Sequence, residues 1–167
     1  EKRLLSYVDK SNENKKNNDS LEVTIKPKDI KKDKYYFATY ALLYYMLVNE
    51  ECLEYYNSGR INFLNEEERF LASEISYYKH KYNTVNVADF YTYLNDKEDL
   101  RKVLDKATSL DLDNSVSVKD IESYISTLHE FQIKEEIEKL KKKIKEEPDV
   151  AKQSEYLMRI AELKKNS

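Results

Sequence analysis

The feature that most constrains this chain is a stretch from Ser117 to Glu147 that contains neither glycine nor proline. Apolar residues recur along almost all of it at helical spacing, which predicts one long helix. They form two stripes, namely Val118, Ile121, Ile125 and Leu128, followed by Ile133, Ile137, Leu140 and Ile144. A straight helix over this span is about 45 Å long, too long to lie wholly against one small bundle. We therefore expect its two halves to pack in different cores.

The register of the apolar residues slips between Leu128 and Ile133, and His129 and Glu130 lie at this break. A long helix that serves two cores can bend between them, so we interpret His129 and Glu130 as a kink or hinge. The second stripe advances in steps of four, three and four residues, which is typical of a narrow packing seam. This half of the helix should therefore pair with one further helix.

Composition supports a helical fold throughout. The 167 residues include one glycine and two prolines, and 37% of the residues are charged. A sheet of this size would need turn residues at every reversal, so long helices are favoured over strands. The predicted fold class is all-α: a helical bundle joined by a long helix to a C-terminal antiparallel helical hairpin. A chain of this length suits one main domain with a small appendage.

We divide the chain into three segments. Residues 1–32 are polar and rich in lysine and asparagine, so they are expected to be a flexible linker or the tail of a preceding domain. Residues 33–130 are expected to form the bundle, and residues 131–167 the C-terminal helical hairpin. Periodicity and breaker residues place the helices at 34–48, 50–57, 66–82, 87–94, 97–109, 118–147 and 150–164.

The expected helix starts share a sequence signature. A residue with a side-chain oxygen stands three positions before an acid at four of them, namely Asn65, Asn86, Asp96 and Ser117. Asp33 and Asp149 are the expected caps of the first and last helices, and Gly59 is the expected left-handed residue after the second. The buried stripe of 66–82 is expected to comprise Phe70, Leu71, Ile75, Tyr78 and Tyr82.

Side chains suited to catalysis are sparse. His80, His129 and the single Cys52 have no partner at the spacing of a metal site or of a nucleophile with its base. The sequence contains no phosphate-binding loop, dinucleotide fingerprint or nucleophile elbow. We therefore expect no catalytic residue, metal or cofactor in this chain, and a binding function instead. Twelve of the fifteen tyrosines lie between Tyr35 and Tyr93 at helical spacing, which favours a core role over base stacking.

Net charge and hydropathy limit the partners. The net charge of −3 and the pI of about 5.6 lack the basic excess of a dedicated nucleic-acid binder, so nucleic acid is not an expected partner. No apolar run is long enough to cross a bilayer, and we expect a cytoplasmic monomer that does not bind membranes. Residues 131–167 carry 10 basic and 8 acidic side chains, a net of +2 against −5 for the rest. The hairpin therefore suits an acidic partner surface.

The last helix has more apolar residues than one seam can bury. Ile160 and Leu163 are expected to face the second stripe of the long helix. Tyr156, Leu157 and Met158 are consecutive, so at about 100° per residue they cannot all face inward. We predict an outward contact with an apolar centre and a charged rim, formed by Lys152, Tyr156, Leu157 and Arg159.

An ordered succession of positions runs through the predicted helices: Ala38, Leu42, Leu43 and Met46; Phe63, Arg69, Leu71, Ala72, Ile75, Tyr77 and Tyr78; Leu100; Asp120, Ile121, Tyr124 and Ile125; Ile137 and Leu140; Asp149, Tyr156, Leu157, Ile160, Ala161 and Leu163. From about Asp33 to Lys165, this succession resembles the C-terminal helicase-binding domain of bacterial DnaG-type DNA primases. Thr39 and Tyr40 stand where an acidic and a basic residue are usual in that family.

The resemblance implies a non-catalytic adaptor. In such primases the hairpin docks on the N-terminal collar of the hexameric DnaB-type replicative helicase. The bundle, which is similar to the N-terminal domain of that helicase, modulates helicase activity during primer synthesis at the replication fork. The zinc-binding and RNA-polymerase domains of the parent DNA primase, a nucleotidyltransferase, would precede Glu1.

Two alternatives stay open. The similarity of the bundle to the helicase N-terminal domain means that the chain could itself be that domain. A helical nucleic-acid-binding module would use the lysines of the hairpin, namely Lys139, Lys141, Lys142, Lys143 and Lys145. Glutamates flank these lysines, which is more typical of a solvated helix face.

Overall fold

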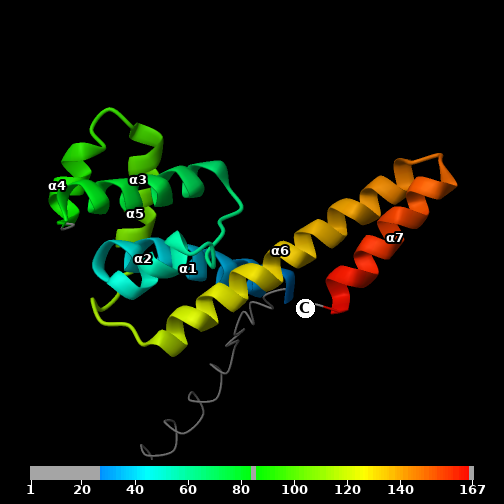
Figure 1. The fold of residues 1–167 in the computed structure, drawn as a ribbon, viewed down its shortest axis with the longest axis horizontal. Coiled ribbons are helices and arrows are strands. Elements are labelled where there is room, and N and C mark those ends of the chain that lie inside the picture. The colour runs from blue at the N-terminus through cyan, green and yellow to red at the C-terminus, as the bar shows by residue number, and fades with distance from the viewer. Residues whose placement is uncertain (1–26, 84–85, 166–167) are drawn as a thin grey trace, which may run out of the picture.

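The computed structural model describes residues 27–83 and 86–165, and every regular element within them is a helix. The helices are α1 (Pro27–Val48), α2 (Glu50–Asn57), α3 (Glu66–Tyr82), α4 (Val87–Tyr93), α5 (Glu98–Thr108), α6 (Val118–Glu146) and α7 (Val150–Lys165). This confirms the all-α fold class. Figure 1 shows α1 to α5 gathered at one end of α6, while the other end of α6 extends away from them beside α7.

The first helix begins earlier than predicted. Residues 1–26 of the predicted linker lie outside the described residues, whereas residues 27–32 form the first turns of α1. Asp33 is therefore inside α1, and its prediction as the N-cap is wrong. Pro27 occupies the first helical position. A backbone N–H at this position would make no intrahelical hydrogen bond, so its absence in proline costs nothing, and the fixed φ of proline suits a helix. Residues 27–32 are mostly polar and show no apolar periodicity, so the sequence did not predict this helix start.

The bundle is built around α1, which packs against α2, α3, α5 and α6. Leu42, Leu43 and Met46 on α1 are completely buried. They belong to one apolar cluster with buried side chains from α2 to α6, among them Phe63 in the connection before α3 and Phe90 on α4. We call this cluster the bundle core. The prediction that the first helix is central is confirmed.

Two predicted caps are confirmed by their hydrogen bonds. The hydroxyl of Ser117 accepts the backbone N–H of Asp120 at 3.2 Å at the start of α6. The side-chain oxygen of Asn86 accepts the backbone N–H of Ala88 at 2.8 Å at the start of α4. Asn65 also stands at the cap position of α3, but its amide group donates to the carboxylate of Glu68 instead. Ser117 and Asn86 therefore each satisfy a backbone N–H at a helix start, whereas the side chain of Asn65 does not.

The start of α5 differs from the prediction by one residue. Lys97, and not Asp96, stands at the cap position before Glu98, and it makes no side-chain capping bond. The N–H of Lys97 donates to the carbonyl of Leu94 at 2.9 Å, so Asp96 lies within a turn and not at the cap. The ammonium group of Lys97 binds the carboxylate of Glu74 on α3.

Gly59 ends α2 as predicted. Its φ is +79°, in the left-handed region that glycine enters without steric cost. The N–H of Gly59 donates to the carbonyl of Tyr56, and the N–H of Arg60 donates to that of Tyr55, both at 2.9 Å. These two bonds are the Schellman arrangement, which satisfies the last carbonyls of α2 and turns the chain toward α3.

The buried face of α3 is only partly as predicted. It consists of Glu68, Leu71, Ala72, Ile75 and Tyr78. Phe70 and Tyr82, which were predicted to be buried, are about half exposed. Phe70 lies beside the buried face, about 100° around the helix from Leu71. Tyr82 is in the last turn of α3, where its ring packs on that of Tyr78 at 4.5 Å and stays open to solvent on the other side.

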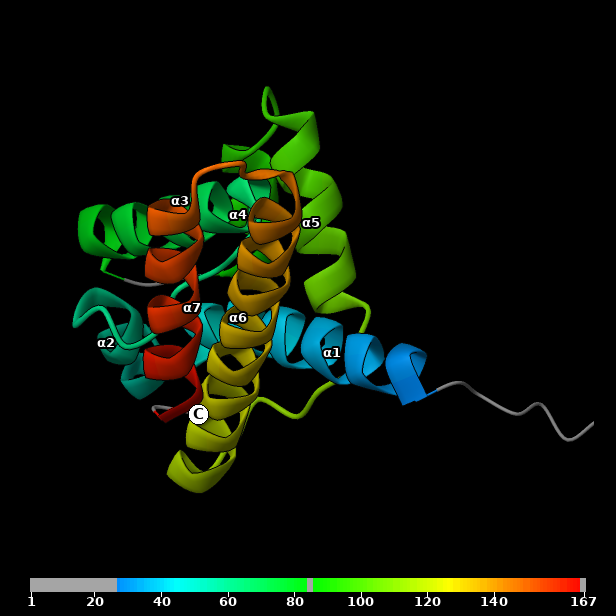
Figure 2. The same ribbon diagram turned by 90° about the vertical axis from the view of Figure 1, so that its right-hand side faces the viewer.

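The two halves of α6 pack in separate cores, as the slip in register predicted. Ile121 and Leu128 belong to the bundle core. Ile133 and Ile137 form a second cluster with Ile160 and Leu163 of α7, bordered by the half-buried Leu140 and Ile144. We call this cluster the hairpin core. Figure 2 shows α6 and α7 side by side, joined at one end by a short connection.

Candidate docking surface on the hairpin

The connection between α6 and α7 fixes how the two helices face each other. Pro148 follows the last turn of α6, and the carboxylate of Asp149 accepts the N–H of Ala151 at 2.8 Å, as expected of a cap. The side chain of Gln153 reaches back and donates to the carbonyl of Glu147 at 2.6 Å. These contacts close the hairpin and place Ile160 and Leu163 against α6.

Two contacts across the hairpin define one of its edges. The guanidinium of Arg159 on α7 donates to the carboxylate of Glu136 on α6 at 3.1 Å. The ammonium group of Lys143 on α6 lies 5.9 Å from the ring centroid of Tyr156 on α7. Lys152 is two turns before Arg159, so it lies on the same side of α7. We call this side of the hairpin the Arg159 edge.

Leu157 lies on the opposite edge of the hairpin. At about 100° per residue it is about 160° around α7 from Arg159 and about 140° from Lys152. Its side chain is 57% exposed, and Val150, on the same side of α7, is 76% exposed. Met158 is 60% exposed but lies about 100° from both Leu157 and Arg159, on the side of α7 that faces away from α6. Ala161 is also exposed on the side of Leu157, one turn after it. We call this side, with its row of exposed apolar residues, the Leu157 edge.

Lysines of α6 border the Leu157 edge. Lys134, Lys141 and Lys145 are spaced seven and four residues apart, so they lie on one side of α6. That side faces away from Glu136, which belongs to the Arg159 edge. All three lysines are exposed and therefore lie next to the apolar row of α7. Glu138 stands in the same row, so the Leu157 edge combines an apolar centre with a border of three lysines and one glutamate.

The lysines of this border are not locked by strong ion pairs. Lys134 pairs with Glu130 at 3.3 Å and Lys141 with Glu138 at 2.7 Å, both within α6. Pairs of this kind, on side chains that are about half exposed, contribute about 0.3 to 0.5 kcal/mol. Their ammonium groups can therefore turn toward the carboxylates of a partner without a large loss of stability.

The structure divides the four residues predicted for docking. Lys152, Tyr156 and Arg159 lie together on the Arg159 edge, where Tyr156 is half-buried under Lys143 and Arg159 also pairs with Glu162 at 3.4 Å. Leu157 lies on the other edge, so the rim beside it is formed by Lys134, Lys141 and Lys145. In the sequence, these lysines can be recognised by their spacing from Ile133 and Ile137, which places them about a quarter of a turn around α6 from the buried stripe.

Contacts next to the predicted hinge join the hairpin to the bundle. α6 runs through the exposed His129 and Glu130 as one helix, and the hinge stays a prediction. Immediately after them, the ring of Phe131 stacks on that of Tyr35 on α1 at 4.0 Å, and the side chain of Gln132 donates to the carbonyl of Asn62. Burial raises the pKa of Tyr35 to about 12.

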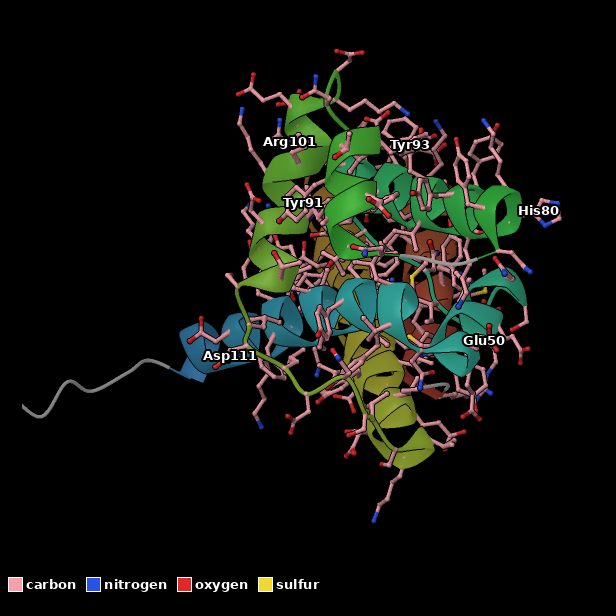
Figure 3. The ribbon with its side chains drawn as sticks, turned by 90° about the vertical axis from the view of Figure 1, so that its left-hand side faces the viewer. Glu50, His80, Tyr91, Tyr93, Arg101 and Asp111 are labelled. Atoms are coloured by element: carbon pink, nitrogen blue, oxygen red, sulfur yellow. The ribbon has the colours of Figure 1, made fainter. Side chains whose placement is uncertain are left out.

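The groups capable of chemistry lie apart from one another. Burial raises the pKa of the Cys52 thiol to about 12, which suppresses its reactive thiolate form. His80 is at the C-terminal end of α3, where Figure 3 shows it pointing away from the bundle. Among residues 27–83 and 86–165, no three histidine, cysteine, aspartate or glutamate side chains are grouped so that they could hold a metal ion.

Comparison of the chain with protein-family models, curated proteins and solved structures finds no match. Within the part of the chain that the structure describes, no helix combines the length and the apolar character that crossing a membrane requires.

Proposed function

We propose that the hairpin docks this chain on a DnaB-type hexameric replicative helicase, and that the chain is the non-catalytic helicase-binding domain of a bacterial DNA primase. The observation that carries the proposal is the Leu157 edge, where large apolar side chains are exposed on an element with its own core. Apolar groups exposed together in this way are typical of a binding surface, since single exposed residues are common but contiguous ones are not.

The resemblance to the primase family supplies the identity of the partner. It covers both the bundle and the hairpin, and the hairpin is the part that docks on the helicase collar in that family. The mixed apolar and basic character of the Leu157 edge suits a helicase surface with an apolar pocket and acidic surroundings. In this role the bundle modulates helicase activity, and the primase that carries the domain synthesises primers in the cytoplasm.

The test is a calorimetric titration of the hexameric helicase with the chain and two variants. Leu157→Ala is expected to weaken binding by about 1 to 3 kcal/mol, as truncation of a central interface residue does. Val118→Ala is the matched control, because Val118 is an aliphatic residue, 41% exposed, at the opposite end of α6. Equal affinity of the Leu157 and Val118 variants, or no binding by the unmodified chain, would count against the proposal.

The lysine row of the Leu157 edge favours one other function, a helical nucleic-acid-binding module. Contacts of Lys134, Lys141 and Lys145 with phosphates would make affinity fall steeply with salt, and each lysine removed would reduce the salt slope by about one. Fluorescence anisotropy with single-stranded and duplex DNA at several salt concentrations measures this slope. Binding to DNA with that slope, together with no binding to the helicase, would replace the proposed function.

A further inference from the structure

A second exposed apolar surface lies on the bundle, between α3 and the start of α5. It is an open groove of about 440 Å³ with Phe70 and Leu100 among the residues that line it. Phe70 is 54% exposed. The other lining residues are Lys97 and the carboxylate residues Glu66, Glu67, Glu74, Asp96, Glu98 and Asp99. We call this surface the acidic groove.

Helix electrostatics explains the acids of the groove individually. Glu66 and Glu67 are in the first turn of α3, and Glu98 and Asp99 are in the first turn of α5, where acids interact favourably with the helix dipole. That effect does not account for a large aromatic ring left half exposed among them. Phe70 would lose contact with water, and be stabilised, if an apolar side chain covered it.

The groove keeps uncompensated negative charge. Lys97 forms an ion pair with Glu74. The hydroxyl of Tyr93, which is labelled in Figure 3, donates to the carboxylate of Glu74 at 2.6 Å. Lys102 pairs with Glu98 at 3.0 Å and with Asp99 at 3.5 Å. Glu66, Glu67 and Asp96 make no ion pair with any residue that the structure describes. An occupant with basic side chains around an apolar one would match this surface.

The Leu157 edge of the hairpin has that character. It carries exposed Val150 and Leu157 beside three lysines and one glutamate of α6, so its excess charge is opposite to that of the acidic groove and its centre is also apolar. We infer that the acidic groove of one copy of this chain binds the Leu157 edge of a second copy, with Leu157 packed on Phe70 and the lysines facing the carboxylates.

The contact is between molecules and not within one. In a single chain the second half of the hairpin extends away from the bundle (Figure 1). The groove is lined by residues of α3, of α5 and of the segment just before α5, all of which belong to the bundle. Each molecule offers one groove and one edge, so the contact is head to tail and leaves a free groove and a free edge after every addition. Assembly therefore continues past a dimer unless it closes into a ring.

The contact is small. The exposed row from Val150 to Ala161 is about 16 Å long at about 1.5 Å per residue, so the interface belongs with weak, transient protein contacts. The chain is then a monomer when dilute and associates only at high concentration. Raising the salt concentration from about 0.1 to 1 M shortens the screening length from about 10 to 3 Å and weakens the association about tenfold.

Two variants with complementary defects test the inference. Phe70→Ser removes the apolar residue of the groove and leaves the hairpin intact, and Leu157→Glu places an acid on the hairpin and leaves the groove intact. Both positions are exposed, so the fold is retained, which circular dichroism verifies. In sedimentation velocity up to about 1 mM the unmodified chain grows in mass, whereas each variant alone stays a monomer. An equimolar mixture of the two variants forms a one-to-one dimer that grows no further.

The matched control is Phe37→Ser, since Phe37 is an aromatic residue on α1 with 42% exposure and no part in the groove. This variant is expected to associate as the unmodified chain does. The inference is overturned if the unmodified chain stays monomeric at about 1 mM or if the mixed variants do not pair. It is also overturned if a lysine-rich amphipathic peptide binds the groove of a chain that never self-associates. All these measurements use the chain alone, so they leave the helicase proposal independent.

Discussion

The bundle core and the hairpin core differ in the number of elements that hold them. The bundle core draws buried side chains from α1 to α6, so each helix is supported by several others. The hairpin core has four buried side chains from two helices, and each helix has the other as its neighbour. Stability within one protein is distributed in this uneven way, and elements with few buried contacts open first. The bundle is therefore the rigid support, and the hairpin is the part best able to adjust to a partner.

The largest effect is expected from a truncation at the centre of the bundle core. Leu42 on α1 is completely buried. Leu42→Ala removes buried apolar atoms and leaves a cavity that neighbouring helices cannot fully close, so it should lower the free energy of unfolding by about 3 to 5 kcal/mol. Urea denaturation followed by circular dichroism measures this. A loss below about 1 kcal/mol would mean that the bundle core is less tightly packed than the burial of α1 indicates.

A truncation in the hairpin core is expected to act locally. Ile137→Ala removes one of four buried side chains and should destabilise the pairing of α6 and α7 by about 2 kcal/mol. Hydrogen exchange should then become faster in α7 and in the second half of α6, with unchanged protection in α1 and α3. Leu157→Ala is the control, because a change at an exposed position should alter stability by less than about 0.5 kcal/mol. Equal loss of protection in the bundle would contradict separate cores.

A smaller effect, with a defined pH dependence, is expected at Glu68 on the buried face of α3. Burial, which disfavours the charged carboxylate, raises the pKa of Glu68 above its usual value of 4.5. The folded state therefore holds the proton more tightly than the unfolded chain does. The resulting stability is present below about pH 4.5 and is lost as the pH rises through the folded-state pKa.

Glu68→Gln removes this ionisation and keeps an oxygen that can accept the hydrogen bond from Asn65. The variant should be more stable than the unmodified chain at neutral pH, because it has no charge to bury, and the difference should become smaller as the pH falls toward 4.5. Denaturation at a series of pH values measures the difference. A variant that is less stable at neutral pH would show that the charged carboxylate has partners that outweigh its burial.

The periodicity of apolar residues predicted the division into two cores, because their spacing changes between Leu128 and Ile133 within a single helix. It was also sufficient for Ser117, Asn86 and Gly59, whose cap and turn geometry depends on neighbouring residues. It was not sufficient for the start of α5, where Asp96 lies within the turn that ends at Lys97, or for Phe70, which is about half exposed. Which side of α3 is covered depends on contacts between distant segments.

The candidate docking surface was predictable in part. Leu157 was predicted to face outward, and it does, because Ile160 and Leu163 determine which side of α7 is buried. The choice of Lys152 and Arg159 as its rim overlooked the angle around the helix, which places them on the other edge. Lys134 and Lys141 belong to a different helix, so their position beside Leu157 depends on how α6 and α7 pair. Sequence spacing within α7 contains no information on that pairing.

If the hairpin is the part that docks on the helicase, the bundle should fold without it and should not bind. A calorimetric titration of the hexameric helicase with the whole chain, and with a chain ended after Gln132, separates the two parts. The shortened chain keeps the contact of Phe131 with Tyr35. It should unfold cooperatively and produce no heat of binding, while the whole chain binds. Binding of the shortened chain with the affinity of the whole chain would show that the hairpin is not the docking element.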